Sequence, residues 1–569
     1  MTAAGDGRAL RAAAFAVLAL GVIGPIAAGL AQTARAAFGL MPAIGAAQAG
    51  LGPWRTLFGL PGFATSVQLT LLTGLGATVL SLAIAFALTA SLHARLAGTA
   101  AARALTPFLA IPHAALAIGL AFVLAPSGWI VRFVAPLLGL DRPPDLALVG
   151  DPWGIALILG LVIKEVPFLV LVTLSALTQF PVRQHLAAGQ SLGYGRAAVW
   201  LKVLAPQLWP LIRLPLMVVL AYALSTVEMG LILGPSNPPV LAVLLTRLFF
   251  DANTALLLPA SAGALLQAGL AVGAFALVWS AERALRRVGL WWLRRGGRGT
   301  AAEPPLRVLA AGGLVLFAIG ALALVALFAW SLAWRWPWPA VLPESWSLKA
   351  WTGAGPGLGR AFLRTLVLAL VTTSLALALA IAWLEGEDRG RRGRAGWAEA
   401  LIFLPLLVPQ IAFLYGLNVL FLRLGLSGGL GAVIWAQALF VFPYVMIALS
   451  DPWRALDPRL PRAAASLGAG PWRRLVAVKL PVLLAPILTA AAIGMAVSVA
   501  QYLPTLFMGA GRIATLTTEA VTLSSASDRR VTGVYATLQA GVPLASYAAA
   551  FLIPALVHRN RRALRGADA

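Results

Sequence analysis

The sequence predicts an all-α polytopic membrane protein with about twelve transmembrane helices, arranged as two parallel six-helix halves in one chain. Three observations carry this prediction. Of the 569 residues, 60% are hydrophobic and only 11% are charged, whereas a soluble domain is nearer half apolar and a quarter charged. Apolar runs long enough to cross a bilayer recur along the whole length. The first and second halves of the chain also share a sequence pattern.

The apolar runs define twelve expected spans. Because the run that starts at residue 12 is only the first of many, we expect a retained helix there rather than a cleaved signal peptide. The expected spans cover residues 12–30, 63–92, 105–125, 153–178, 214–234, 259–281, 308–333, 365–384, 398–422, 429–450, 482–505 and 533–557.

The net charge of +24 is explained by topology. With the N-terminus inside, the inner loops hold more than twice as many Lys and Arg residues as the outer loops, as the positive-inside rule requires. We therefore expect a multi-pass protein of the bacterial inner membrane with both termini cytoplasmic, and no binding of nucleic acid. The chain has no cysteine, and its four histidines are scattered singly, so no metal site is predicted.

The most basic stretch lies in the middle of the chain. Residues 283–307 hold seven arginines together with glycines and prolines that break helices. We expect a cytoplasmic linker here, which divides the chain into a first transmembrane domain, 1–282, and a second, 308–569.

The two domains repeat each other. The helix that starts near Thr70 resembles the helix that starts near Thr365, and the segment after Ile111 resembles the segment after Val408. Pro167-Phe168 likewise matches Pro443-Tyr444. Because each half contains an even number of spans, the two halves run in the same sense, so the repeat is parallel.

The sharpest repeated feature is a polar loop on the inner face, at 183–206 and again at 458–481. Pro206 follows Gly193 by 13 residues, and Pro481 follows Gly468 by the same 13. We expect a short helix, a glycine turn, and a second helix that ends at the proline. Ordinary linkers vary freely in length, so the matched spacing favours a docking element over a plain connecting loop.

These loops resemble the EAA loop of permease subunits in bacterial binding-protein-dependent ABC importers, a pattern that reads Glu-Ala-Ala-x-Ser-Leu-Gly and reaches a proline about a dozen residues later. Here Ala187 and Arg462 stand where the pattern has glutamate. The resemblance implies a fold of two type I importer membrane domains. It also implies contacts with an ATPase through Ala187, Ala188, Ser191, Leu192, Gly193, Pro206, Arg462, Ala463, Ala464, Ser466, Leu467, Gly468 and Pro481.

The resemblance further implies partners and a substrate class. Two copies of a cytoplasmic ATPase would bind ATP and Mg, an extracytoplasmic binding protein would deliver the solute, and membrane lipid would surround the chain. Fusion of two halves resembles the ferric-iron and thiamine branch, and residues 503–520 resemble a thiamine-permease subgroup. The substrate implied is a small solute, thiamine-like or ferric iron.

The chain itself is not expected to be an enzyme or to bind a cofactor. A phosphate-binding P-loop needs a Gly-Lys-Ser/Thr sequence, but none of the four lysines, Lys164, Lys202, Lys349 and Lys479, follows a glycine. No catalytic residues are predicted, and the ATPase must be a separate chain.

Polar residues inside the expected spans are candidates for the translocation pathway, because ionisable groups in a bilayer are costly and are usually functional. The candidates are Lys164, Glu165, Glu228, Asn418 and Gln501. The alternative is structural, as interhelical hydrogen bonds or a buried ion pair. Two carboxylates would suit a cation, and Lys164 would oppose one, so the sequence leaves the substrate open.

Two other functions would fit parts of the pattern. A twelve-helix secondary transporter coupled to an ion gradient would also have six-plus-six repeats and intramembrane carboxylates, but it gives no reason for the matched inner loops. A membrane scaffold or an intramembrane enzyme would need large extramembrane domains or a catalytic constellation, and the sequence shows neither.

Overall fold

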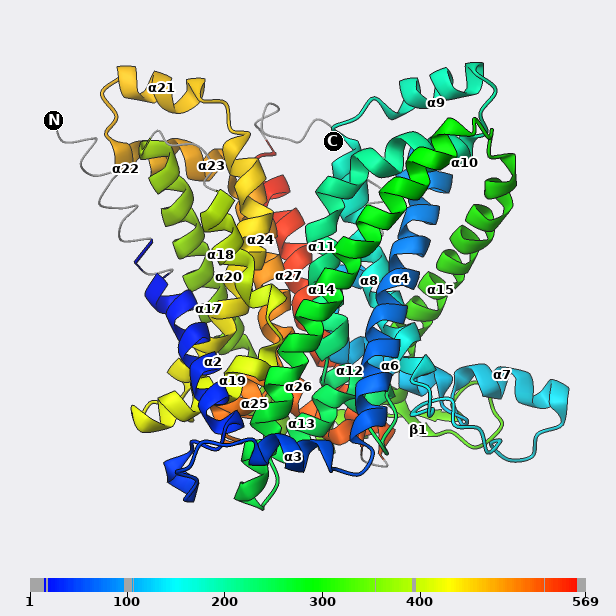
Figure 1. Ribbon diagram of the computed structural model, residues 1–569, viewed down its shortest axis with the longest axis vertical. Helices are drawn as coiled ribbons and strands as arrows, with labels where there is room; N and C mark the ends of the chain where they lie inside the picture. Colours follow the sequence, from blue (N-terminus) through cyan, green and yellow to red (C-terminus); the bar gives the residue numbers. More distant parts are fainter. Residues whose placement is uncertain are drawn as a thin grey trace.

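The computed structural model describes residues 15–16, 19–96, 105, 107–353, 355–390, 396–525 and 528–559, without the side chains of residues 300 and 396–399. These residues form a helical bundle with one two-stranded antiparallel sheet (Figure 1). Elements of the first half are η1 (Ala19–Ile23), α2 (Gly24–Ala37), η2 (Pro42–Ile44), α3 (Gly52–Phe58), α4 (Phe63–Leu96), α6 (His113–Leu124), α7 (Trp129–Leu138), α8 (Ile155–Leu177), α9 (Val182–Ser191), α10 (Arg196–Val199), η3 (Trp200–Leu204), α11 (Ala205–Ser225), α12 (Glu228–Leu233), α13 (Leu241–Phe249), η4 (Thr254–Leu256) and α14 (Leu257–Arg294).

The second half repeats this order with small additions. Its elements are η5 (Thr300–Ala302), α15 (Glu303–Leu332), β1 (Ala333–Arg335), β2 (Ser345–Trp346), α16 (Lys349–Gly353), α17 (Gly355–Arg389), α18 (Gly396–Leu407), α19 (Gln410–Arg423), α20 (Leu430–Arg454), α21 (Arg459–Ser466), α22 (Pro471–Arg474), η6 (Leu475–Lys479), α23 (Leu480–Val482), α24 (Leu484–Ala500), α25 (Leu503–Gly509), α26 (Leu516–Ser524) and α27 (Arg529–Val557).

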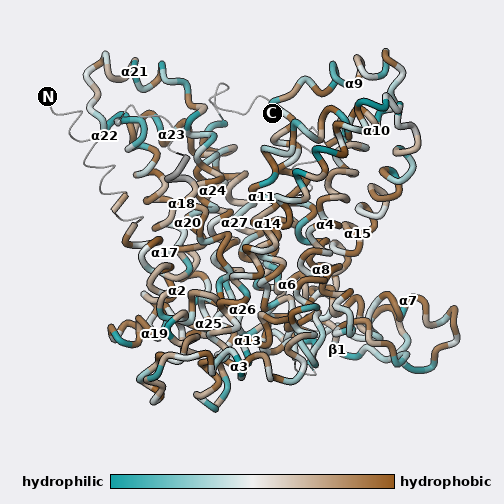
Figure 2. Tube along the Cα trace, viewed as in Figure 1, coloured by the Kyte–Doolittle hydropathy of each residue, from teal (hydrophilic) through white to brown (hydrophobic). Residues whose placement is uncertain are grey.

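The membrane-spanning character predicted from composition is confirmed. In the described part of the chain, nine helices are long and apolar enough to cross a bilayer, and two bent pairs raise the number to eleven. The first expected span, 12–30, corresponds to η1 and the shorter α2, and residues 12–14, 17 and 18 of it lie outside the described residues. Figure 2 shows hydrophobic residues along the helices and hydrophilic residues gathered near α9, α10, α21 and α22.

Each half places its first helix against the other half. Helix α2 packs on α19, and α15 packs on α6. Close approach depends on matched glycines: a Cβ atom at Gly416 would meet the backbone of α2, and a Cβ atom at Gly119 would meet the carbonyl oxygen of Ala323 in α15. Small residues allow membrane helices to pack closely in the absence of a hydrophobic driving force. Because each half packs its first helix on the other half, the two halves are interlocked.

A repeated hydrogen bond supports the register of the sequence repeat. The Thr70 hydroxyl accepts a hydrogen bond of 2.8 Å from the Leu241 amide, and the Thr365 hydroxyl accepts one of 2.9 Å from the Leu516 amide. Each threonine lies in a long membrane helix, and each amide lies at or next to the start of a short helix, α13 or α26. The amides at a helix start have no partner within that helix, so each threonine satisfies a buried donor.

Two expected boundaries are wrong. The fifth span does not cover 214–234: helix α11 begins at Ala205 and ends at Ser225, and the chain turns before α12. The linker is also shorter than 283–307, because α14 continues to Arg294 and α15 starts at Glu303. Pro304 sits in the first turn of α15, where its missing N–H would be unpaired in any case.

Candidate functional site

The two repeated loops, 183–206 and 458–481, lie at the same end of the molecule on separate arms (Figure 1). Their first helices, α9 and α21, end in the same way. Gly193 has φ +78° and Gly468 has φ +81°, a left-handed conformation that glycine adopts without steric cost. The Ser191 hydroxyl donates to the Ala188 carbonyl at 2.9 Å, and the Ser466 hydroxyl donates to the Ala463 carbonyl at 2.8 Å.

The second helices of the loops also match in detail. Gly195 and Gly470 each precede a four-residue helix, α10 or α22, and each helix continues into a five-residue π-helical stretch, η3 or η6. These elements start at the same distance from Gly193 and Gly468. π-helical turns within α-helices are rare and often occur at functional sites. The repeat therefore extends to an uncommon backbone geometry.

The loops differ at their prolines. The second helix of the first loop does not end at Pro206, as the sequence predicted, but runs on from Arg196 to Ser225. Both prolines follow a π-helical stretch, so the stretch alone does not account for the difference. In the second loop the helix does end, one residue after Pro481, and α24 follows at an angle of 78°.

Each loop presents an apolar side chain to the surroundings. Leu192 is 68% exposed and Leu467 is 87% exposed, each directly before the turn glycine. Helix α21 has no buried residue at all, and α9 buries only Val182 and Leu186. Both leucines are therefore left largely uncovered by the described part of the bundle.

The two loops rest on different supports. In the first loop, Lys202 Nζ donates to the Gly297 carbonyl at 2.5 Å, and the Gly195 amide donates to the Arg298 carbonyl at 3.2 Å. The Arg196 amide donates to Glu303 Oε1 at 3.1 Å. The first loop is therefore held by the connection between the two halves.

The second loop is held by buried charges. Lys479 Nζ lies 2.7 Å from Glu385 Oε2 and 2.5 Å from Asp388 Oδ2, and the Arg389 Nε atom lies 2.8 Å from the other oxygen of Glu385. The Arg389 guanidinium stacks on the Trp472 ring at 4.6 Å. These acidic residues belong to the end of α17, so the network ties the second loop to its own membrane helix.

A cavity of about 120 Å³ lies between the two halves, and residues of both halves line it. We call it the interface cavity. Its lining residues are His113, Val218, Ala221, Tyr222, Ser225, Thr226, Glu228, Pro405, Leu406, Val408, Gln410, Phe440, Tyr444, Val497, Ala500, Gln501, Tyr502 and Leu503. Two of them, Glu228 and Gln501, are pathway candidates from the sequence.

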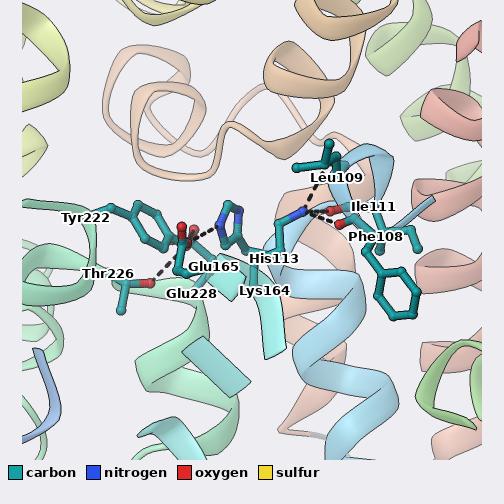
Figure 3. Close-up of polar contacts among 9 residues, drawn as sticks. All are labelled: Phe108, Leu109, Ile111, His113, Lys164, Glu165, Tyr222, Thr226 and Glu228. Carbon is teal, nitrogen blue, oxygen red and sulfur yellow. Dashed lines mark hydrogen bonds and ion pairs between the residues drawn. The ribbon is translucent and has the colours of Figure 1, made fainter. Parts of the chain in front are cut away.

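A chain of polar contacts links both buried glutamates to this cavity (Figure 3). The Tyr222 hydroxyl donates to Glu228 Oε1 at 2.8 Å, and the Tyr222 ring lies 4.3 Å from the His113 ring. His113 Nε2 lies 3.4 Å from Glu165 Oε1. Glu165 thus lies next to the cavity, behind His113.

Lys164 faces another way. Its ammonium donates to the carbonyls of Phe108, Leu109 and Ile111 at 2.9, 3.2 and 2.5 Å, and Figure 3 shows it directed away from the two glutamates. Carbonyls at a helix end lack intrahelical partners, and this stretch comes directly before Pro112. The lysine therefore caps a broken helix and does not line the cavity.

The remaining candidate, Asn418, is not brought to the cavity. It lies in α19, and its Oδ1 accepts a hydrogen bond of 2.9 Å from the Ser427 hydroxyl. Sequence reasoning missed His113, Tyr222 and Tyr444. His113 had a signal, because it follows Pro112 inside an apolar run and matches Gln410, a polar residue at the repeat-related position. Tyr222 and Tyr444 had none, because aromatic residues are common in membrane helices.

The sequence is similar to those of known membrane transport proteins. The inner membrane ABC transporter permease protein YnjC of Escherichia coli K12 is 31% identical over 518 residues, which cover 90% of this chain and 92% of the relative. The chain belongs to the ABC transporter permeases. No model of a protein family matches the sequence.

Other related permeases match only part of the chain. The molybdenum transport system permease ModB of Mycobacterium tuberculosis is 29% identical over 209 residues, which cover 34% of this chain and 75% of the relative. The putative 2-aminoethylphosphonate permease PhnV of Salmonella typhimurium is 25% identical over 168 residues, 29% of this chain and 63% of the relative. These relatives are thus about half as long, as expected if this permease fuses two membrane domains.

Membership in this family fixes several general properties. The permease is a multi-pass protein of the inner membrane and the membrane component of an ABC import system. It works with an ATPase and a solute-binding protein and is not itself an enzyme. The names of the relatives indicate no common substrate, because these proteins belong to molybdenum and 2-aminoethylphosphonate transport systems.

Proposed function

We propose that this permease couples ATP hydrolysis to import through the repeated loops, with one ATPase subunit docked on each. The matched geometry of the loops carries this proposal, since both have the same turn, the same π-helical stretch and an exposed leucine. The docking residues are those of the two EAA-like patterns, Ala187 to Gly193 and Arg462 to Gly468. Pro206 and Pro481 mark where each loop joins its membrane helix.

The proposed arrangement has a defined sidedness. Helices α9 and α21 lie on the cytoplasmic face, where two copies of the ATPase bind ATP and Mg, and the opposite end receives the binding protein. The chain itself binds no cofactor. The two halves, divided at the short connection between α14 and α15, form the two membrane domains, and membrane lipid surrounds them. Closure of the ATPase dimer would bring the two arms together and shift the cavity between inward and outward access.

The two ATPase contacts are proposed to be unequal. Neither loop has the glutamate of the EAA pattern, but the replacements differ: a neutral alanine at 187 and a basic arginine at 462. The supports differ as well, since the first loop rests on the connection between the halves and the second on buried ion pairs.

The substrate is proposed to be a small solute of the thiamine or ferric-iron type. Support comes from the fusion of two halves and from the resemblance of residues 503–520 to a thiamine-permease subgroup.

Cysteine cross-linking tests the docking proposal without background, because the chain has no cysteine. Leu192→Cys and Leu467→Cys variants are purified with the ATPase and treated with a short cross-linker that joins the introduced thiol to a lysine amine of the ATPase. Leu348→Cys, which is 64% exposed before α16, serves as the control. We expect adducts with the ATPase at both loop positions and none at the control. A complex that stays assembled but gives no adduct at either loop would refute docking there.

A further inference from the structure

We propose that the interface cavity binds an organic cation through Glu228 and Gln501. The inference rests on the proposed function, since it assigns a substrate class to the pathway between the two halves. It starts from side chains of the cavity whose hydrogen-bonding capacity is not used within the described part of the protein.

The cavity holds acceptors that lack donors. Glu228 is only 8% exposed and lines the cavity, and one of its carboxylate oxygens accepts from Tyr222. Gln501 is also 8% exposed, and among the described residues no donor lies within hydrogen-bond distance of its Oε1 atom. A buried acceptor left unpaired costs about 1–3 kcal/mol. A ligand that carries positive charge and donates hydrogen bonds would relieve both groups.

The charge around the cavity is negative. Glu228 lines the cavity and Glu165 lies behind His113, which is the basic side chain of the cavity lining. The two acidic side chains therefore outnumber the one basic side chain at this wall. Lys164 interacts electrostatically with Glu165, but three backbone carbonyls hold its ammonium, which points away from the two glutamates (Figure 3). Among the described residues, no arginine or lysine lines the cavity, so its charged side chains favour a cation over an anion.

Aromatic rings make the site suited to an organic cation rather than to a bare metal ion. Tyr222, Phe440, Tyr444 and Tyr502 line the cavity together with His113. The face of an aromatic ring attracts a cation, and the attraction grows when the pair is removed from water. A metal ion would instead need several oxygen ligands at short distance, and the described residues contain no group of three acidic or histidine side chains that could hold a metal.

The second half contributes neutral groups at the related positions. Gln410 stands at the place of His113, and Phe440 and Val441 align with Lys164 and Glu165. The negative charge is therefore confined to one wall of the cavity, and the other wall supplies rings and the amide of Gln501. This one-sided design suits a solute with a single cationic end.

The test uses two small probes that differ in charge but hardly in shape, choline and its uncharged isostere 3,3-dimethylbutan-1-ol. Binding to the full-length permease in lipid nanodiscs is measured by calorimetry, with and without the ATPase and in buffers with low and high K⁺. We expect choline to bind at least about tenfold more tightly than the isostere, a difference of ~1.4 kcal/mol. Equal binding of the two probes, or displacement of choline by K⁺ at equal concentration, would overturn the inference.

Variants make the test specific. Glu228→Gln should weaken choline binding about tenfold, and Gln501→Glu should strengthen it. Tyr444→Leu should weaken it by a smaller factor. Glu344→Gln makes the same chemical change at an exposed carboxylate in the outer loop and should have no effect. If the Glu228→Gln variant does not fold, the tighter choline binding expected of Gln501→Glu still tests the site. Unchanged or weaker binding by that variant would count against the site.

Failure of this inference is distinguishable from failure of the proposed function. Co-purification of the ATPase and its ATP hydrolysis are recorded on the same samples. A permease that assembles with the ATPase but does not prefer choline refutes the cation site alone. A permease that prefers choline but holds no ATPase supports the cation site and refutes docking at the loops.

Discussion

Gly193 and Gly468 share one left-handed backbone conformation, with φ +78° and +81°, at the same point of two loops that lie 275 positions apart in the sequence. A Cβ atom at Gly468 would meet no other atom within 4 Å. The requirement for glycine there therefore comes from the backbone and not from packing. Because a Cβ atom at position 468 would contact nothing, the turn can be tested without disturbing the packing of the helix bundle.

Gly468→Val should weaken binding of the ATPase. A β-branched residue in the left-handed region costs about 1–2 kcal/mol, which corresponds to a loss of affinity of about 5- to 30-fold. The measurement is the affinity of the purified permease for its ATPase. Gly470→Ala is the matched control, because Gly470 has φ −66° and also has open space around it. Equal effects of the two substitutions would contradict the role assigned to the turn.

Lys479→Met should destabilise the second half. The lysine and Glu385 are both buried, and removal of one partner of a buried ion pair typically costs about 3–5 kcal/mol. Thermal unfolding in detergent measures the loss. Arg335→Met breaks the ion pair with Glu344, which is largely exposed, and should cost less than about 1 kcal/mol. A loss at Lys479 no larger than that at Arg335 would show that the network does not hold the second loop.

Thr70→Val and Thr365→Val should cost similar amounts of stability. Each removes the acceptor of a buried amide, that of Leu241 or Leu516, and an unpaired buried donor costs about 1–3 kcal/mol. Thr78→Val is the control, because its hydroxyl bonds only to the Gly74 carbonyl of its own helix. Chemical unfolding of the three variants compares them. Effects on one half only would show that the two hydrogen bonds are not equivalent.

Arg132→Met should release the loop that contains β1 and β2. The buried guanidinium donates to the carbonyls of Pro337 and Ala340 at 2.8 Å each and to that of Ser127 at 2.9 Å. Its loss leaves these acceptors without their charged donor. We expect faster hydrogen exchange over residues 333–346 with unchanged exchange in α9 and α21. An equal increase in hydrogen exchange in residues 333–346, α9 and α21 would contradict a local anchoring role for Arg132.

The sequence was sufficient for the features that repeat. Matched positions of Gly193 and Gly468 predicted two equivalent turns, and apolar runs predicted the membrane helices. The ends of helices were harder to predict. Pro206 is a helix breaker by rule, yet the helix continues through it, whereas the helix at Pro481 ends after a π-helical stretch of the same length. No local sequence pattern distinguishes the two outcomes.

The polar lining of the cavity could be predicted only in part. Glu228 and Gln501 stood out because they are polar residues in apolar runs, and both line the cavity. The direction in which a side chain points could not be predicted. Lys164 and Glu165 are neighbours in sequence, but the lysine caps a broken helix and the glutamate faces His113. Which of two adjacent residues faces a pathway depends on the packing of distant helices, which a single sequence does not specify.

ATP-dependent uptake into vesicles tests the central claim most directly. Vesicles hold the permease with its ATPase oriented toward trapped ATP, and the binding protein is loaded with its labelled solute outside. We predict uptake that requires ATP, persists when an uncoupler removes the ion gradient, and falls by up to about 5- to 30-fold with Gly468→Val. Uptake that proceeds without ATP and stops with the uncoupler would contradict the account and identify a secondary transporter.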